Sequence, residues 1–455
     1  MLDNINFNMA FDRKKLEAEI IDQYLTEDGG KPWIVGFSGG KDSTMIMQLV
    51  WYSLMKIKPK DRKRVIHVVC NNTMVENPKV LDYVEVVLNK MEKAAKDQKL
   101  PITVNRTRPR LEDSFWVNLI GKGYPAPNNM FRWCTERLKI TPTTNFILDK
   151  INENGEVIIL LGTRSDESSN RAASIKKHEI KGSRLRRHVL PNAYVYAAIK
   201  DVITEEVWKY LLAAPCPWGA SNRDLVTLYG NASGGDCPLV VDIATPSCGQ
   251  SRFGCWVCTV VRKDKSMQGL IDNGEEWLEP LIDIRDFLSD TINRDHKDYE
   301  KMKLEYRMGR RRNGSAGLGP YRPKWRKYIL EQILEAQKII QKDNPFVSLI
   351  TNQELVAIQV TWYRDNIFDN DVSEIYNRIL GKEFALSSEI DQSLKKEKDV
   401  LLESCDNSKE VFKLINDLLT LQHSKILMMN KWGLQKDLES KLEEHLYPKK
   451  EHVHK

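Results

Sequence analysis

Apolar and polar positions follow two different periods along the first two hundred residues. Four short apolar runs have the length of buried strands, at residues 31–37, 64–70, 101–105 and 156–162. Helix-length segments with apolar residues at helical spacing separate them, at residues 12–24, 43–56, 77–97 and 141–154. This alternation predicts an α/β fold, a parallel twisted sheet with flanking helices that binds ligands at the carboxyl ends of its strands.

The pattern changes after residue 200. Residues 204–208 (TEEVW) predict a capped helix start, and residues 213–262 are rich in Gly, Pro and Cys without a clear period. A long irregular segment of this kind is typical of a functional or metal-bound region. Residues 280–306 predict a helix, residues 307–327 are rich in Arg and Gly, and residues 328–455 are mostly charged helix.

We therefore expect four parts. They are an N-terminal helix (1–30), an α/β domain (31–200), a region with the cysteines and a basic loop (201–330), and a helical C-terminal region (331–455).

Composition narrows the class of protein. The 455 residues are 29% charged, and no apolar run approaches the roughly 18 residues of a membrane-spanning helix. The N-terminus lacks the apolar stretch of a signal peptide, so we expect a cytoplasmic enzyme with no membrane partner. The net charge of +6 permits a nucleic-acid partner without indicating one. Because disulfides form mainly in exported proteins and we expect a cytoplasmic one, the eight cysteines favour metal or redox chemistry over disulfides.

The segment 36–43 (GFSGGKDS) joins the first expected strand to its helix and suits a bound pyrophosphate. Gly39 and Gly40 allow a tight turn that exposes backbone N–H groups, and the following helix directs its positive end there. Lys41 adds a cation, while Ser38 and Ser43 add hydroxyl donors.

The spacing excludes a Walker A loop, because three residues rather than four separate Gly36 from Gly40-Lys41 and Asp42 follows. SGGKDS instead resembles the PP-loop of ATP pyrophosphatases, which split ATP between its α and β phosphates. The resemblance implies that residues 38–43 hold the β- and γ-phosphates of ATP with Mg²⁺ as counter-charge. Asp42 would act through Mg²⁺ or cap its helix. Asn71 and Asn72 would contact the nucleoside or simply form a turn.

A second polar segment, 161–171 (LGTRSDESSNR), follows the fourth expected strand. Arg164 and Arg171 present planar donors suited to phosphate or sulfate, and Asp166 and Glu167 would orient them or bind Mg²⁺. The segment resembles one in the PAPS reductase group of the PP-loop family, which binds the acidic end of the substrate. Residues 132–142 (RWCTERLKITP) resemble a two-cysteine segment of iron–sulfur APS reductases, with Trp133 in place of one cysteine and Lys139 one position late.

The cysteines 248, 255 and 258 bring three thiolates into eleven residues (CGQSRFGCWVC). Their C-x₂-C pair lets two sulfurs reach one metal or cluster, and Cys134 is the expected fourth ligand, with Cys237 as its rival. An iron–sulfur cluster, most naturally 4Fe-4S, is the favoured occupant; structural zinc and unrelated buried thiols remain alternatives.

Together these four segments resemble the DndC family of bacterial DNA phosphorothioation, and its single-strand counterpart SspD, over about residues 30–330. The resemblance implies a sulfurtransferase that joins AMP to a DNA backbone phosphate and then replaces a non-bridging oxygen with sulfur. Implied catalytic residues are Lys41, Asp42, Arg164 and Arg171. Implied partners are DNA, a cysteine desulfurase as sulfur donor, and other phosphorothioation proteins (DndD/DndE-like or SspB/SspC-like).

Two basic runs are candidates for DNA contact. Arg184, Arg186 and Arg187 form the first; the second surrounds Arg310, Arg311 and Arg312 in a Gly-rich segment and is favoured, because flexible Arg-rich loops suit phosphate contacts. A solvated charged face is the ordinary alternative.

Three other functions stay open. A PAPS or APS reductase usually needs a redox-active C-terminal cysteine, and residues 406–455 contain none. A tRNA thiolase shares SGGKDS but usually has paired C-x₂-C elements. A non-catalytic, nucleotide-gated subunit of a DNA defence complex would not need to keep Lys41 and Asp42.

Overall fold

The computed structural model describes most of the chain up to residue 365. The described residues are 12–180, 182–232, 253–292, 305–308, 319–365, 367, 371–382, 384, 400–406, 408, 410–415, 418 and 442.

A six-stranded sheet forms the centre of the α/β part, in the order β3-β2-β1-β4-β6-β5. The strands are β1 Trp33–Gly36, β2 Ile66–Asn71, β3 Ile102–Thr107, β4 Val157–Leu160, β5 Leu185–Arg187 and β6 Ala193–Tyr196. All pair in parallel except β5, which lies antiparallel at the edge. The four strands expected from the sequence are confirmed. The pair β5–β6 was not expected, because β5 is three residues long and two of them are arginines.

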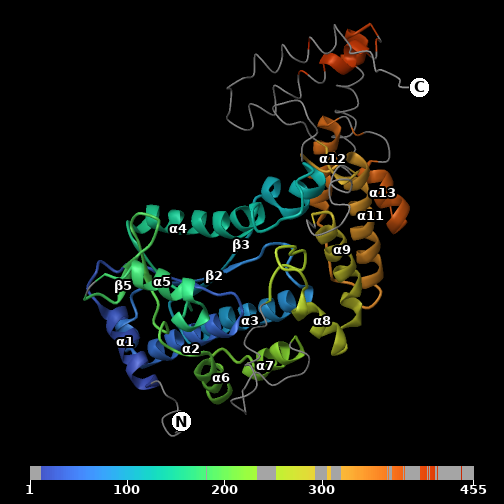
Figure 1. Ribbon diagram of the computed structural model, residues 1–455. Helices are drawn as coiled ribbons and strands as arrows, with labels where there is room; N and C mark the ends of the chain where they lie inside the picture. The colour runs from blue at the N-terminus through green and yellow to red at the C-terminus, as the bar shows by residue number, and fades with distance from the viewer. Residues whose placement is uncertain are drawn as a thin grey trace.

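Four helices follow the expected alternation within a few residues: α1 Arg13–Leu25, α2 Lys41–Lys56, α3 Pro78–Asp97 and α4 Thr141–Asn154. Helices α2 and α3 cover one face of the sheet and α4 covers the other (Figure 1). The side chains of β1 show why: Trp33 and Val35 pack in the core with α2 and α3, whereas Ile34 packs with Ile147 and Ile151 of α4. Successive strand residues point to opposite faces, so a sheet buried on both faces needs a continuous apolar run.

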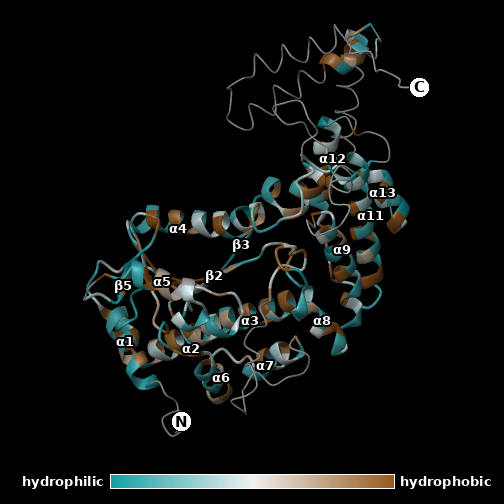
Figure 2. Cartoon of the chain, in the orientation of Figure 1, coloured by the Kyte–Doolittle hydropathy of each residue, from teal (hydrophilic) through white to brown (hydrophobic). Residues whose placement is uncertain are grey.

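Further helices complete the described chain. They are α5 Ser169–Lys177, α6 Thr204–Ala213, α7 Asn222–Asn231, α8 Lys265–Asp272, α9 Glu279–Asp290, α11 Pro323–Ile340, α12 Asn352–Arg364 and α13 Val372–Leu380. Short turns of helix lie between them at η1 Pro59–Asp61, η2 Leu111–Asp113, η3 Val117–Gly121, η4 Thr135–Ile140, η5 Ser165–Glu167 and η7 Glu276–Leu278. Hydrophobic and hydrophilic residues alternate around these helices, as in amphipathic helices with one buried face (Figure 2).

Helices α8, α9 and α11–α13 share one hydrophobic core with η3. Trp116 donates its indole N–H to the Leu349 carbonyl at 2.7 Å, and Trp362 donates to the Ile120 carbonyl at 2.9 Å. The buried indoles therefore fasten the later helices to the loop after β3. No helix in the described part of the chain has the length and apolar character needed to cross a membrane.

Candidate functional site

The loop between β1 and α2 has the geometry of an anion-binding turn. Gly39 has φ +74°, and a Cβ added there would lie 2.4 Å from Cγ2 of Val84, so both the turn and the space require glycine. Ser43 Oγ donates to the Gly40 carbonyl at 2.9 Å and lies 3.3 Å from the Ser38 backbone nitrogen, which donates to it. The Ser43 hydroxyl thus closes the loop, and α2 begins directly after it with its N-terminal N–H groups directed at the turn.

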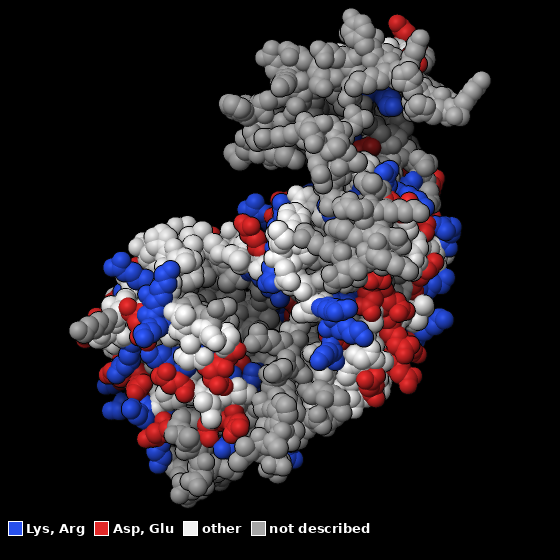
Figure 3. Space-filling view, viewed as in Figure 1, with Lys and Arg blue, Asp and Glu red and all other residues white. Residues whose placement is uncertain are grey.

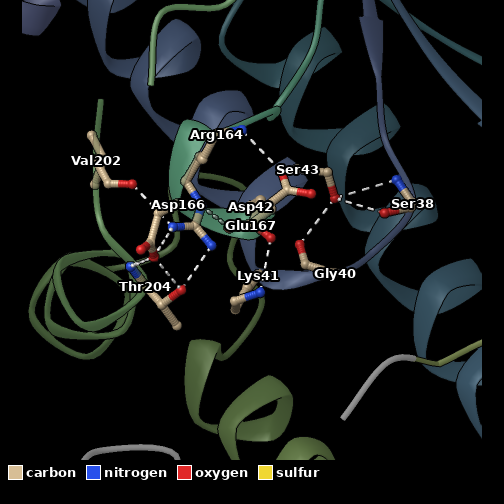
Figure 4. A network of polar contacts seen from close by, with 10 residues as sticks. All are labelled: Ser38, Gly40, Lys41, Asp42, Ser43, Arg164, Asp166, Glu167, Val202 and Thr204. Carbon is tan, nitrogen blue, oxygen red and sulfur yellow. Dashed lines mark hydrogen bonds and ion pairs between the residues drawn. The ribbon is translucent and has the colours of Figure 1, made fainter. Parts of the chain in front are cut away.

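Two charges meet at the first turn of α2. Lys41 Nζ lies 2.9 Å from Oδ2 of Asp42, and the other oxygen of Asp42 accepts a hydrogen bond from Arg164 Nε at 2.7 Å (Figure 4). Helix α2 is capped by Gly40 without a side-chain bond, so Asp42 does not cap it. Of the two roles expected for this carboxylate, capping is therefore wrong; it lies between two cations instead.

Arg164 is the most buried charge of the site, with 1% of its surface exposed. Besides Asp42, its guanidinium donates to Asp166 at 3.2 Å, to the Val202 carbonyl at 3.0 Å and to Thr204 Oγ1 at 3.0 Å (Figure 4). The sequence led us to expect a donor directed at substrate. In the structure, the N–H groups of this guanidinium bond mainly to protein groups. Arg164 therefore links the PP-loop helix to the turn before α6.

Asp166 completes this link from the side of α6. It accepts hydrogen bonds from the backbone N–H and the hydroxyl of Thr204, at 3.0 and 2.9 Å. Burial works against its ionisation, but the bonds from Thr204 and Arg164 outweigh it and lower the pKa of Asp166. The helix α6 begins where expected, but Ile203 rather than Thr204 is its N-cap, and no side chain caps it. Thr204 serves Asp166 instead.

Gly162, just after β4, packs against the backbone of the PP-loop helix. A Cβ added at Gly162 would lie 2.7 Å from the Asp42 carbonyl oxygen. The two motifs that the sequence placed far apart are therefore in direct contact, through the Gly162 backbone and the Arg164 side chain.

These residues line a cavity of about 840 Å³. Its polar side is formed by residues 38–43 with Arg164, Asp166 and Glu167. The lining also includes Thr204 and Glu205, from the helix start expected at residues 204–208, and Val80, Ile203, Leu228, Tyr229 and Phe253, which the sequence did not single out. A volume of this order suits a nucleotide, with phosphates on the polar side and a base against apolar groups. Val80, Leu228, Tyr229 and Phe253 carry no local signal, since they come from α3, α7 and the cysteine-rich segment.

Three of the four expected cysteine ligands lie in one neighbourhood. The backbone of Cys255 forms an isolated antiparallel β-bridge with that of Glu76, just after β2. Cys258 donates its N–H to the Cys255 carbonyl at 3.0 Å. Cys255 Sγ also lies 3.3 Å from Oγ1 of Thr73. Burial raises the pKa of the Cys134 thiol, and the charge of Cys258 nearby acts in the same direction. The donors are thus thiols from two separate segments, the set that iron–sulfur clusters and structural zinc both use.

The fit to a metal is incomplete in the part of the chain that the structure describes, which contains no group of three or more His, Cys, Asp or Glu side chains arranged to hold a metal ion. The remaining candidates, Cys248 and Cys237, lie outside the described residues. Cys70 and Cys405 are buried.

The other predicted site residues either bond to protein groups or lie outside the described part of the chain. Asn71 donates to the Leu138 carbonyl at 2.8 Å, 67 residues along the chain, and so links two segments. Asn72 accepts from the Met74 N–H at 2.7 Å and stabilises local structure. In the first basic run, Arg184 pairs with Asp22 at 2.5 Å. Arg171 lies in α5, but its side chain is outside the described part, and so are Arg310, Arg311 and Arg312.

Comparison with known proteins identifies the class. The chain carries a nucleotide-binding α/β domain with a PP-loop-like turn, and the model of the phosphoadenosine phosphosulfate reductase domain matches residues 32–261. These residues are half of the chain, and the protein therefore belongs to the phosphoadenosine phosphosulfate reductase domain family. Membership places it among enzymes of sulfur and nucleotide chemistry.

Individual relatives are more distant. An uncharacterized protein of Methanocaldococcus jannaschii is 30% identical over 188 residues, 41% of this chain and 33% of that protein. The matched segment thus spans about a third of this curated relative. Among solved structures, the chain is similar to the phosphoadenylyl-sulfate reductase of Candida auris in a phosphate complex (12% identity, TM-score 0.29, 45% of this chain and 85% of that one). It is also similar to the U34-tRNA thiolase NcsA of Methanococcus maripaludis with its [4Fe-4S] cluster (13% identity, TM-score 0.29, 51% of this chain and 80% of that one). Both structural similarities are too low to indicate a function.

Proposed function

We propose that this protein is an ATP-dependent sulfurtransferase that modifies a phosphate of the DNA backbone, as in the DndC family of phosphorothioation proteins. One observation carries the proposal: the nucleotide cavity and the thiols share one short segment. Phe253 lines the cavity and packs its ring on Tyr229 at 4.9 Å, and Cys255 follows two residues later beside Glu76. A site for adenylation and a site for sulfur would then act on the same bound substrate.

The first step requires a bound triphosphate whose α-phosphorus is accessible to a nucleophile. The turn at residues 38–40 and the N-terminus of α2 would bind the β- and γ-phosphates of ATP through backbone N–H groups, with Mg²⁺ as counter-charge. A DNA phosphate oxygen attacks the α-phosphorus, the bond to the β-phosphate oxygen breaks, and pyrophosphate leaves. Lys41 neutralises the departing charge, and Asp42 holds its ammonium in place through the 2.9 Å contact.

The second step replaces oxygen by sulfur. Adenylation converts the non-bridging DNA oxygen into the bridge to AMP, which is a good leaving group. A sulfur nucleophile then attacks the DNA phosphorus, and AMP departs with that oxygen. We propose a cysteine desulfurase as donor of the sulfur, as persulfide. A second thiol or two electrons would then cleave the S–S bond and leave sulfur on the DNA.

Cys134, Cys255 and Cys258, with Cys248 or Cys237, would hold a 4Fe-4S cluster in this proposal. Bound there, it would carry a terminal sulfur, supply electrons or cross-link the fold. Cys255 lies beside Glu76, in the segment after the carboxyl end of β2, and β2 is next in the sheet to β1 and its PP-loop.

The decisive experiment incubates the protein with DNA and ATP labelled at the α-phosphate. We expect AMP to become attached to DNA and pyrophosphate to be released. The variant Lys41→Ala should lose about a hundredfold or more of this activity, the magnitude typical of a removed charge-stabilising donor. Lys90→Ala, an exposed lysine on α3, is the matched control and should retain it. ADP as the only nucleotide product would refute adenylation.

A reductase that releases sulfite is the second candidate, because the family includes that activity in its name. Such enzymes usually use a redox-active C-terminal cysteine. Cys405 is the last cysteine in the sequence, and it is 4% exposed. Sulfite release from phosphoadenylyl sulfate, without AMP on DNA, would favour this candidate.

A further inference from the structure

A short basic loop follows directly after the second thiol of the C-x₂-C pair. Arg262, Lys263 and Lys265 are exposed there. Asp264, the one acid among them, uses its carboxylate to cap α8 by accepting the Met267 N–H at 3.0 Å. Among the residues that the structure describes, none of the three cations forms an ion pair. Within the described residues, three positive charges without an ion-pair partner thus lie at the surface, four to seven residues after Cys258.

A fully buried cation fixes this loop. Arg285 of α9 is 1% exposed and donates to three loop carbonyls: Nε to Cys258 at 3.1 Å, Nη1 to Arg262 at 2.9 Å and Nη2 to Val261. Its Nη1 also pairs with Asp286 at 2.5 Å. At the start of the loop, Thr259 donates its hydroxyl to the Pro127 carbonyl at 2.5 Å. A charged surface that only contacts solvent does not need its backbone fixed by hydrogen bonds of this kind. Fixing the backbone in advance lowers the entropy lost when the loop binds a ligand.

The loop also has the right reach. Arg262 follows Cys258 by four residues, so their Cα atoms lie at most about 14 Å apart. Neighbouring phosphates of one DNA strand are separated by about 3.4 Å along the helix axis. Phosphates on either side of one placed at the thiols therefore fall within range of these cations. Basic side chains gather over the region of α8 in the space-filling view, beside a patch of acidic side chains (Figure 3).

We infer that Arg262, Lys263 and Lys265 form a DNA-phosphate clamp that binds the phosphates flanking the modified one. The inference rests on the proposed function, because it takes DNA as the substrate. It names cations other than Arg310, Arg311 and Arg312, which lie outside the described residues. Such contacts fix the register of the DNA and are independent of base sequence.

The test compares two triple variants of the full-length protein with equal charge change. The first is Arg262→Gln, Lys263→Gln, Lys265→Gln. The control is Lys58→Gln, Lys60→Gln, Lys63→Gln, which neutralises three exposed cations in the loop before β2, at the amino end of that strand. Binding of a fluorescent duplex oligonucleotide is measured by anisotropy over a series of salt concentrations. Melting temperatures verify that both variants are folded.

For the clamp variant we expect about a tenfold to hundredfold loss of affinity near 0.1 M salt and a salt slope smaller by about 2 to 3, one unit per lost phosphate contact. The control should change the slope by less than about one. Equal effects of both variants, or an unchanged slope in the first, would overturn the clamp.

Attachment of AMP to DNA by the unmodified protein is scored separately. If the adduct forms while the clamp variant binds like wild type, the clamp fails and the proposed function stands. If the unmodified protein neither binds DNA nor forms the adduct, both fail. Loss of slope with tRNA but not with DNA would reassign the loop to RNA and also overturn the inference.

Discussion

Arg164 Nε donates a hydrogen bond to Oδ1 of Asp42 at 2.7 Å, although 122 residues separate them in the chain. The bond joins the loop after β4 to the PP-loop helix after β1, and these strands are neighbours in the sheet. Lys41 contacts the other oxygen of the same carboxylate. The position of the lysine that would face the nucleotide is thus coupled, through one acid, to a buried arginine that is itself held by Thr204 and the Val202 carbonyl.

Removal of the Arg164 guanidinium should destabilise the protein strongly. Arg164→Gln leaves Asp42 and Asp166 without their shared cation, and we expect a loss of about 3 kcal/mol in the free energy of unfolding by chemical denaturation. Arg184→Gln, which breaks the exposed pair with Asp22, is the control and should cost about 1 kcal/mol or less.

Arg164→Lys separates positioning from stability. It keeps the charge but not the planar fork, so it should recover part of the stability while ATP turnover stays low. Equal losses for Arg164→Gln and Arg184→Gln would contradict the role of Arg164 as a buried link.

Gly162→Ala should distort the nucleotide site without touching it directly. The added Cβ would lie 2.7 Å from the Asp42 carbonyl oxygen, so the first turn of α2 must shift. We expect the KM for ATP to rise about tenfold or more, with a smaller loss of stability, measured by pyrophosphate release and thermal melting. Gly254→Ala is the matched control, since an added Cβ there meets nothing within 4 Å. A normal KM in Gly162→Ala would show that the contact does not position the loop.

Stability should depend on the ionisation of Asp166 in acid. Its pKa is lowered in the folded protein, so the folded state binds the proton less readily than the unfolded state does. The stabilisation is therefore complete above the unfolded pKa of about 4 and is lost as the pH falls through the lower folded pKa. We expect the difference in melting temperature between wild type and Asp166→Asn to shrink from pH ~6 to pH ~3.

Asp201→Asn, at an exposed position one turn before α6, serves as the control. A gap between wild type and Asp166→Asn that stays constant across the acid range would contradict the assignment.

Iron content tests the thiols. Protein purified without oxygen should be brown, with broad absorbance at about 400 nm and bound iron and sulfide. Cys255→Ser and Cys258→Ser should lose the iron, whereas Cys216→Ser should keep it. Comparison of Cys134→Ser with Cys237→Ser identifies the fourth ligand. Stoichiometric zinc without iron in wild-type protein would contradict the cluster.

The sequence by itself determined the architecture of the α/β part. Apolar runs such as residues 31–37 and 156–162 predict strands buried on both faces, and the helical period between them predicts parallel pairing. It also located the PP-loop, because Gly39, Gly40 and Lys41 act through backbone conformation and charge within a few consecutive residues. Local physics suffices for both, and the family match over residues 32–261 agrees with them.

Only the tertiary structure decided what distant residues do for one another. Arg164 could be recognised as a donor in the sequence, but its acceptors Asp42 and Thr204 become neighbours only when β1 and β4 pair and α6 packs beside them. Likewise, no local period or motif indicates that Tyr229 and Phe253 line the cavity, or that Arg285 bonds to the loop after Cys258. Hydrogen bonds between segments depend on where the packed core places each backbone, and a one-dimensional pattern does not contain that placement.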